Sequence, residues 1–401
     1  MNGGLPPVTP FLRLSRVHAL MVAGETAMAL ALADSLFLSI SPDAARSKVI
    51  LFLAVSMAPF AVVAPLVGPF IDRMRGGQRM VVLVAGILRA LVLVGMANTL
   101  DSLTLFPLAF AALILSKTYA IAKSSLVPTT IPDVDGLVEA NSKLGQIAGI
   151  TGFVVAVPAA LLQLISTQAT LGLGVLSFLF AALNAYRLPK LVVASTPAGA
   201  LETEELHSPA VVTAAMAMRI LRGVVGFMFF HLAFWLRREI AGTAWFGLAI
   251  ALSGLATLGA NFMGPRLRRK LRVEMMLFTS LVAIGLAGVG AAWSGRITAG
   301  ILLAALVNAA AAIGRLAFEA TVQSGAPDAN RGRAFARFET QNQMAWVAGG
   351  LVPVVFTPSG WVGFAIVGVA GIAGAVMCVR RGAVTIGFRA GQSKGQGRRS
   401  R

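Results

Sequence analysis

The chain has 401 residues, of which 57% are hydrophobic and only 12% are charged. This composition excludes an ordinary soluble protein and indicates a chain that crosses a lipid bilayer several times. The formal charge of +18 would suggest nucleic-acid binding in a soluble protein, but the basic residues lie in short gaps between apolar stretches, as in cytoplasmic loops, so we expect no nucleic-acid partner.

Six apolar stretches fill the first half of the chain. Each is long enough to cross about 30 Å of hydrocarbon, which takes roughly 20 helical residues. They predict helices over residues 18–40, 49–71, 80–100, 103–123, 139–165 and 168–187. In the second of these stretches, Pro59, Pro65 and Pro69 predict bends.

The composition changes at residues 188–208, where prolines, a glycine and glutamates indicate a cytoplasmic linker. A second set of helices is predicted over residues 209–236, 244–264, 275–295, 298–321, 334–356 and 361–379. The predicted fold class is therefore an all-α membrane protein with twelve transmembrane helices in two pseudo-symmetric halves, residues 1–187 and 209–380. Residues 381–401 are a basic tail that we expect in the cytoplasm.

The distribution of charge predicts the orientation in the membrane. With a cytoplasmic N-terminus, the inner loops hold most of the lysines and arginines, and the outer loops hold only Arg46, Lys48, Arg237, Arg238 and Arg296. The predicted outer helix ends carry the tryptophans of an interfacial aromatic belt, Trp235, Trp245, Trp293 and Trp361. We therefore expect a protein of the inner (plasma) membrane with both termini in the cytoplasm.

The most distinctive motif lies between the second and third predicted helices. It follows the pattern G-x-x-x-D-R, continues with glycines and ends on a further arginine: Gly68, Asp72, Arg73, Gly77 and Arg79. Gly68 allows close helix packing, and Gly77 belongs to the turn. Asp72 lies where it can meet a helix N-terminus or an arginine. The alternative interpretation is an ordinary basic loop between two helices.

The two halves of the chain repeat weakly. Gly68-Pro69 recurs as Gly264-Pro265 after 196 residues, and Pro132-Asp133 recurs as Pro327-Asp328 after 195 residues. The nearly constant offset places the repeats in equivalent loops. A repeat of six helices is typical of transporters whose two halves surround a central site.

The loop motif resembles the loop between helices 2 and 3 of the major facilitator superfamily of transporters. The resemblance covers the whole chain, through the number of helices, the linker and the repeat, and it implies two six-helix halves around a central cavity. It also implies that Asp72, Arg73 and Arg79 stabilise one state of the transport cycle through the inner end of helix 11. The second copy of the motif has no acid at the position of the aspartate.

Charged residues inside predicted spans are functional candidates, because burying charge in hydrocarbon is unfavourable. The first span carries Glu25 and Asp34, which are nine residues apart and point to nearly opposite faces at about 100° per residue. Arg89 lies at the middle of the third span and must pair or face water, with Glu25 or Asp34 as possible partners. Each of the three could serve transport or only hold helices together.

Four further charges are candidates for transport or coupling. Lys117 could extend from the inner half of helix 4 to the cytosol. Arg222 could anchor helix 7 on the cytoplasmic side. Arg315 and Glu319 are four residues apart and share one face of helix 10, so we expect an ion pair, either as a gate or as a static brace.

The sequence contains no pattern for a metal, a cofactor or an enzyme active site. It has three histidines, a single cysteine and no cluster of the two with metal-ligand spacing. No nucleotide-binding motif and no converging nucleophile and acid/base set is found. We therefore expect no metal, no cofactor and no enzymatic activity.

The predicted function is secondary transport by alternating access, as a monomer that exports small amphiphilic molecules in exchange for protons. The acid in helix 1 is similar to that of bacterial drug/proton antiporters, where a cationic solute could compete with the proton. Two features depart from that group: Lys117 stands in place of the usual arginine of helix 4, and helix 5 lacks the glycine-proline motif. Metabolite uptake, lipid movement and a non-transporting scaffold or sensor stay open.

Overall fold

The computed structural model describes residues 9–37, 77–100, 102, 104–131, 136–188, 208–237, 239–325 and 331–381. Within these ranges the chain is helical with short connections, and it contains no strand. The second predicted span, most of the linker and the tail lie outside the described residues.

The described helices of the first half are α1 (Pro10–Phe37), α4 (Gly77–Ala97), α5 (Leu105–Leu126), the short 3-10 helix η2 (Val127–Thr130), α6 (Leu137–Ile165) and α7 (Thr167–Ala185). Those of the second half are α9 (Pro209–Leu236), α10 (Gly242–Lys270), α11 (Val273–Ser294), α12 (Ile297–Gly325), α13 (Arg331–Phe356) and α14 (Gly360–Arg380). All predicted helices except the second are therefore present in the described part of the chain. The first one begins at Pro10 instead of residue 18.

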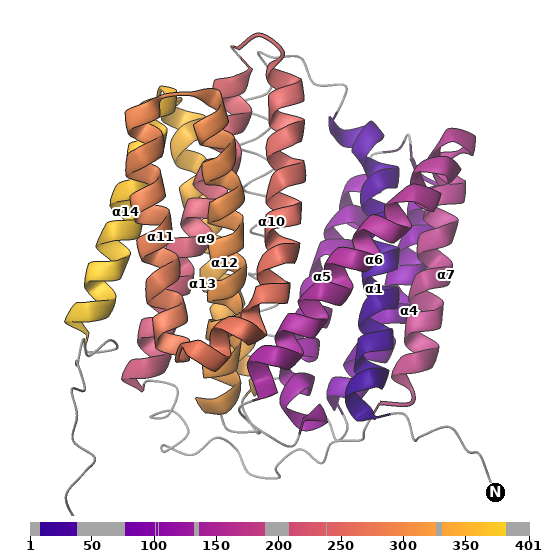
Figure 1. Cartoon of the computed structure of the whole chain (residues 1–401). Coiled ribbons are helices and arrows are strands. Elements are labelled where there is room, and N and C mark those ends of the chain that lie inside the picture. Colours follow the sequence, from indigo (N-terminus) through magenta and orange to yellow (C-terminus); the bar gives the residue numbers. More distant parts are fainter. Residues whose placement is uncertain are drawn as a thin grey trace, which may run out of the picture.

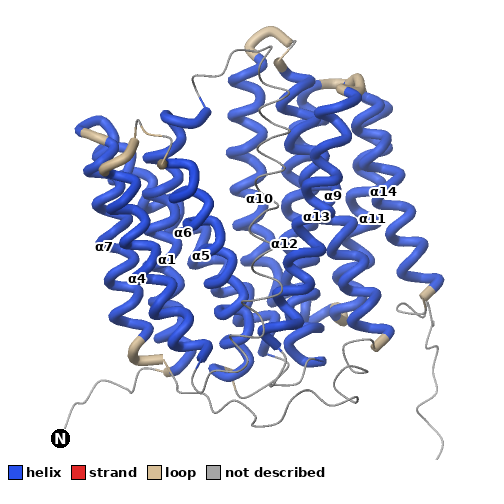
Figure 2. Tube along the Cα trace, turned by 180° about the vertical axis from the view of Figure 1, so that it is seen from behind, coloured by secondary structure: helices blue, strands red, loops and turns tan. Residues whose placement is uncertain are grey.

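The helices form two bundles that stand side by side (Figure 1, Figure 2). The N-terminal bundle contains α1 and α4 to α7, and the C-terminal bundle contains α9 to α14. The bundles meet where α6 packs against α10 and α12, and where α5 packs against α13. Nine of the described helices are long and apolar enough to cross a membrane. The chain is therefore a multi-pass membrane protein.

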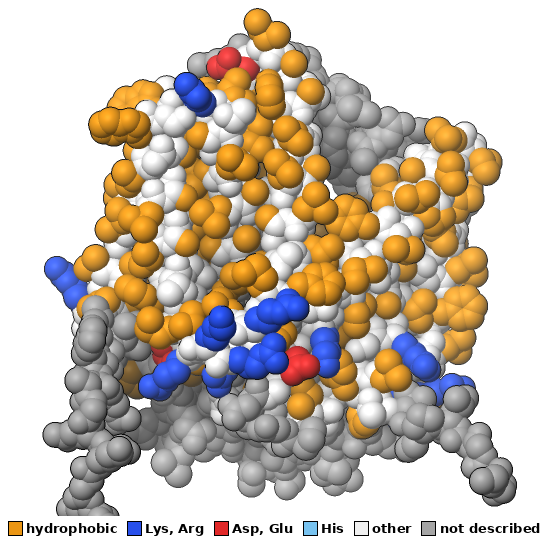
Figure 3. Space-filling model, in the orientation of Figure 1, with side chains coloured by type: hydrophobic (Ala, Val, Ile, Leu, Met, Phe, Trp, Pro, Cys, Tyr) orange, Lys and Arg blue, Asp and Glu red, His pale blue; other side chains and the backbone are white. Residues whose placement is uncertain are grey.

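One end of both bundles is basic. In the C-terminal bundle, α10 ends with Arg268, Arg269 and Lys270, and Figure 3 shows lysine and arginine side chains gathered along this lower edge. In the N-terminal bundle, Arg13 Nη1 donates to the carbonyl of Arg187 over 3.0 Å, and Arg79 Nη1 donates to that of Leu188 over 3.5 Å. The starts of α1 and α4 therefore lie beside the end of α7. We call this the basic end.

The predicted helix end at residue 264 is wrong, because α10 continues through Pro265 to Lys270. Proline has no N–H to donate, so the carbonyl of Asn261, four residues earlier, loses its usual partner within the helix. Two side chains of α6 replace that partner. The Ser142 hydroxyl donates to the Asn261 carbonyl, and Gln146 Nε2 donates to it over 3.1 Å. The helix therefore continues past the proline with this carbonyl hydrogen-bonded.

Helices inside the C-terminal bundle approach one another at glycines. Gly288 of α11 faces the backbone of Gly368 in α14, and Gly226 of α9 faces the backbone of Trp346 in α13. A Cβ atom at Gly288 or Gly226 would collide with these backbone atoms. Small residues at such contacts let membrane helices pack closely, which holds the bundle together without polar bonds.

We expect Gly288→Ala to lower the thermal unfolding midpoint of the purified protein in detergent, because the added Cβ would force α11 and α14 apart. Overpacking of this kind costs about 1–3 kcal/mol. Gly290→Ala is a matched control on the same helix, since a Cβ at Gly290 meets nothing within 4 Å. The midpoints are measured from the change in protein fluorescence on heating. Equal midpoints for the two variants would contradict the close packing.

Candidate functional site

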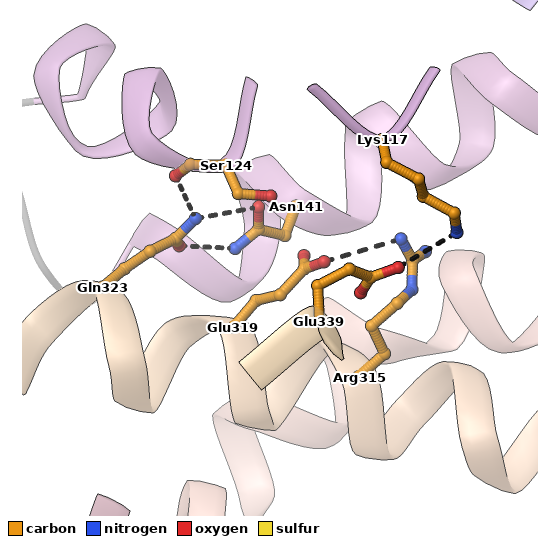
Figure 4. A network of polar contacts seen from close by, with 7 residues as sticks. All are labelled: Lys117, Ser124, Asn141, Arg315, Glu319, Gln323 and Glu339. Atoms are coloured by element: carbon orange, nitrogen blue, oxygen red, sulfur yellow. Dashed lines mark hydrogen bonds and ion pairs between the residues drawn. The ribbon is translucent and has the colours of Figure 1, made fainter. Parts of the chain in front are cut away.

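An ion pair joins the two bundles. Lys117 Nζ of α5 lies 3.1 Å from Glu339 Oε1 of α13, as Figure 4 shows. Lys117 therefore pairs with a carboxylate of the other bundle instead of extending to the cytosol as predicted. Arg222 of α9 and Arg315 of α12 also act electrostatically on the Glu339 carboxylate. Arg222 thus faces a charge at the centre of the protein in addition to any anchoring role.

A second ion pair lies within α12, next to the first. Arg315 Nη1 is 3.7 Å from Glu319 Oε1, so the pairing predicted from the spacing of four residues is confirmed. Figure 4 shows the guanidinium of Arg315 beside the Glu339 carboxylate, between the two bundles. The arginine therefore connects the pair within α12 to the pair between the bundles.

Hydrogen bonds extend this network toward the basic end. Asn141 Nδ2 of α6 donates to Gln323 Oε1 of α12 over 2.7 Å. The amide nitrogen of Gln323 donates to the carbonyl of Ser124 in α5 over 3.0 Å (Figure 4). One glutamine of the C-terminal bundle thus holds two helices of the N-terminal bundle.

The polar contacts between the bundles share one location. Gln323 stands close to the end of α12, Asn141 close to the start of α6, and Asn261 within the last third of α10. All of these positions are nearer the basic end than the opposite end. Among the described residues, the bundles are therefore joined by polar side chains on the side predicted to face the cytoplasm.

Glu25 and Arg89 form the ion pair that the sequence suggested, with Arg89 Nη2 3.4 Å from Glu25 Oε1. The Ser116 hydroxyl of α5 donates to the same carboxylate oxygen over 2.5 Å. Arg89 is fully buried, and its guanidinium lies 4.2 Å from the centre of the Phe178 ring. The Glu25 side chain is 44% exposed. A buried cation thus has an accessible carboxylate as its counter-charge.

The remaining predicted residues are only partly described. Asp34 lies in α1, but its side chain is outside the described residues, as are Gly68, Asp72 and Arg73. Gly77 is the first residue of α4. In the described part of the chain, Arg79 contacts the end of α7, through the Leu188 carbonyl and the ring of Tyr186 at 5.1 Å. The role of the loop motif in transport stays a prediction.

A cavity of about 210 Å³ lies between the bundles. Helices α1, α5 and α6 line it from one side, and α10 and α12 line it from the other. Its charged and polar lining consists of His18, Lys123, Arg315, Thr257 and Asn261. The rest of its wall is formed by small or apolar residues, Gly145, Ala148, Gly149, Gly254 and Leu258. The cavity therefore combines a cationic region with an apolar surface.

Several residues of this site did not stand out in the sequence. Lys123 marked the end of a predicted helix, yet it lies buried inside α5. Asn261 is a single polar residue in an apolar stretch, and this interruption is the signal that could have identified it. Asn141 and Gln323 stand among other polar residues, so their neighbours in the sequence do not single them out. Their partners lie in other helices and do not follow from spacing.

Comparison with models of known protein families finds no match for the chain. Among curated proteins, uncharacterized protein ML2143 of Mycobacterium leprae (strain TN) is 29% identical, with 85% of this chain and 66% of that protein covered. Uncharacterized protein Rv0876c of Mycobacterium tuberculosis (strain ATCC 25618 / H37Rv) is 28% identical, with 85% and 68% covered. The chain thus spans about two thirds of the length of these relatives.

Solved transporter structures resemble the chain over nearly its whole length. A bacterial homologue of the iron transporter ferroportin in an outward-facing state has a TM-score of 0.72 at 17% identity, covering 94% of this chain and 100% of that chain. The major facilitator superfamily transporter FucP in an outward conformation has a TM-score of 0.73 at 13% identity, covering 93% and 98%. The chain has the major facilitator fold. The proton:xylose symporter XylE shares this fold, with a TM-score of 0.70 at 14% identity and coverage of 92% and 95%.

In this major facilitator fold, we expect Glu339→Gln to lower the thermal unfolding midpoint more than Lys117→Gln does. Without the carboxylate, Lys117, Arg222 and Arg315 lose a shared counter-charge, whereas without the lysine the carboxylate keeps both arginines. Removing one partner costs about 0–1 kcal/mol for an exposed ion pair and about 3–5 for a buried one. Glu139→Gln, at an exposed pair on α6, is the control and should leave the midpoint unchanged. A larger loss in Lys117→Gln would contradict this charge arrangement.

Proposed function

We propose that the protein is a secondary transporter that moves a small solute across the membrane by alternating access. The main support for this proposal is the contrast between the contacts within the bundles and the contacts between them. Within the C-terminal bundle, glycines bring helix backbones together. Between the bundles, the described contacts include an ion pair and side-chain hydrogen bonds at the basic end. Such an interface can break while each bundle moves as a rigid body, which is the motion that alternating access requires.

The comparisons support this proposal through the fold. FucP, XylE and the ferroportin homologue are named as transporters, and each covers more than nine tenths of this chain. The alternatives are a membrane enzyme and a non-transporting scaffold or sensor. Within the described residues, ion pairs between and beside the bundles lie next to a cavity with a cationic lining, which favours passage of a solute over either alternative.

For the driving force, we propose proton coupling at Glu25. Its carboxylate is accessible and is the counter-charge of the buried Arg89. Proton binding to Glu25 would leave that arginine without its partner, so proton binding and separation of the pair favour each other. When the bundles move against each other, the access of water to this pair would change, and Glu25 would then load or release a proton. The resemblance to antiporters supports export in exchange for protons. The alternative is uptake together with protons, and the charge of the solute decides between the two.

We expect the purified protein in liposomes to concentrate an amphiphilic solute when a pH gradient is imposed, and Glu25→Gln to abolish this accumulation. The variant should still exchange labelled for unlabelled solute, because exchange needs no net proton movement. A solute screen with and without the gradient identifies the solute and the direction of transport. Glu139→Gln serves as the control, since it removes an exposed carboxylate on the surface of α6. Proton-driven accumulation that persists in Glu25→Gln would refute the coupling role.

We further propose that both termini face the cytoplasm and that the protein acts in the inner membrane as a monomer. The basic end supports this orientation, because cytoplasmic loops are enriched in lysine and arginine. A reporter enzyme that works only in the cytoplasm, fused after Arg401, should be active. Activity of a reporter that works only outside the inner membrane, fused at the same position, would overturn the orientation.

A further inference from the structure

The cavity between the bundles has a cationic region in its lining, formed by Lys123 and Arg315. We propose that it binds the anionic group of a small amphiphilic solute, so that the solute of the proposed transporter is an anion. The step from binding to transport rests on the proposed function, whereas binding itself can be measured without transport.

Among the described residues, positive charge exceeds negative charge where the bundles meet. Around the cavity and the neighbouring ion pairs, the described charged side chains are four cations and two carboxylates: Lys117, Lys123, Arg222, Arg315, Glu319 and Glu339. The nearby Glu25 is already matched with Arg89. Because protein and hydrocarbon screen charge poorly, this excess favours the entry of an anion.

Lys123 is a cation of the cavity that has no adjacent counter-charge in the described part of the chain. It lines the cavity and is only 8% exposed. In the ranges that the structure describes, its ammonium group forms no ion pair, and Glu319 and Glu339 act on it from a greater distance. A buried ammonium without an adjacent counter-charge is unfavourable. A bound carboxylate, sulfonate or phosphonate group would supply that counter-charge.

The shape of the cavity limits the rest of the solute. Its volume of about 210 Å³ is below the roughly 300–1,000 Å³ of pockets for drug-sized ligands, so the solute is small. Gly149 and Leu258 belong to its apolar wall, while Thr257 adds a hydroxyl group. A compact molecule with one anionic group and an apolar body matches this lining.

The same geometry disfavours the cationic solute that an acid in helix 1 suggested. Glu25 lies in contact with Arg89 and Ser116, so its carboxylate is not a free site for an ammonium group. A cation in the cavity would meet Lys123 and Arg315 directly. Like charges at such distances repel, and the apolar surroundings strengthen the repulsion.

The test measures solute binding through protection of a thiol placed in the cavity. The buried Cys378 is first replaced by alanine, and Thr257→Cys then introduces a single thiol in the lining. The rate of labelling of the full-length protein by a neutral maleimide is measured with benzoate, phenylphosphonate, benzamide or benzylamine present. These probes share one ring and differ in charge. We expect at least one of the two anions to slow labelling at about tenfold lower concentration than benzamide does, because one hydrogen bond to a charged group has an effect of this size. Benzylamine should give no protection.

The protection should depend on the cations of the cavity. Lys123→Gln and Arg315→Gln should each remove most of the preference for the anion. If Lys123→Gln does not fold, Arg315→Gln alone tests this dependence. Lys143→Gln, which removes an exposed lysine paired with Glu139, should leave the preference unchanged.

Three results would overturn the proposal: no protection by either anion, equal or better protection by benzylamine, or an anion preference that survives in Lys123→Gln and Arg315→Gln. The outcome is independent of the proposed function. If the protein binds the anions but transports no solute, the proposed anion site stands and the proposed transporter function fails. If the protein transports only neutral or cationic solutes and the anions do not slow labelling, the proposed transporter function stands and the proposed anion site fails.

Discussion

The packing of α6 against α10, where the two bundles meet, centres on one backbone carbonyl that its own helix cannot satisfy. Pro265 deprives the Asn261 carbonyl of a donor within its own helix, and a buried backbone carbonyl needs another partner. The side chains of Ser142 and Gln146 supply the donors from the opposite bundle. Their helix can come this close because Gly145, on the same face, carries no Cβ that would meet the Asn261 side chain. A helix-breaking residue thus creates a hydrogen-bonded contact between α6 and α10.

The ion pair between the bundles is weak enough to form and break. Lys117 and Glu339 are 27% and 32% exposed, so water already competes for their charges, and the net stabilisation by the pair is small. The contacts inside the bundles are different in kind, since Gly226 and Gly288 place backbone against backbone. Separating those helices would open voids along their length. The two bundles therefore move more easily against each other than either one deforms.

The sequence predicts helices well here, because a bilayer requires long apolar segments and such segments are visible in composition alone. It also predicts the partner of Arg315, from spacing within one helix. For Arg89 the need to neutralise a central charge leaves Glu25 and Asp34 as possible partners, and the structure pairs it with Glu25. It does not predict that Lys117 meets Glu339, since the two are 222 residues apart and the pattern of one helix does not reveal which helix it faces. The continuation of α10 past residue 264 does not follow from the sequence for the same reason, because the donors that allow it belong to α6.

The sign of the charge in the cavity also bears on how proton and solute are coupled. Glu25 acts electrostatically on Lys123, so the proton site and the cavity are within reach of each other. A proton on Glu25 would make the surroundings of the cavity more positive, and an anion in the cavity would make them less so. Each would therefore favour binding of the other, and this effect is reciprocal by thermodynamic linkage. Exchange needs a proton and a solute that compete, as a cation would, whereas an anion at Lys123 and a proton at Glu25 assist each other. An anionic solute thus favours movement of both in the same direction, and the charge of the solute decides between uptake with protons and export against them.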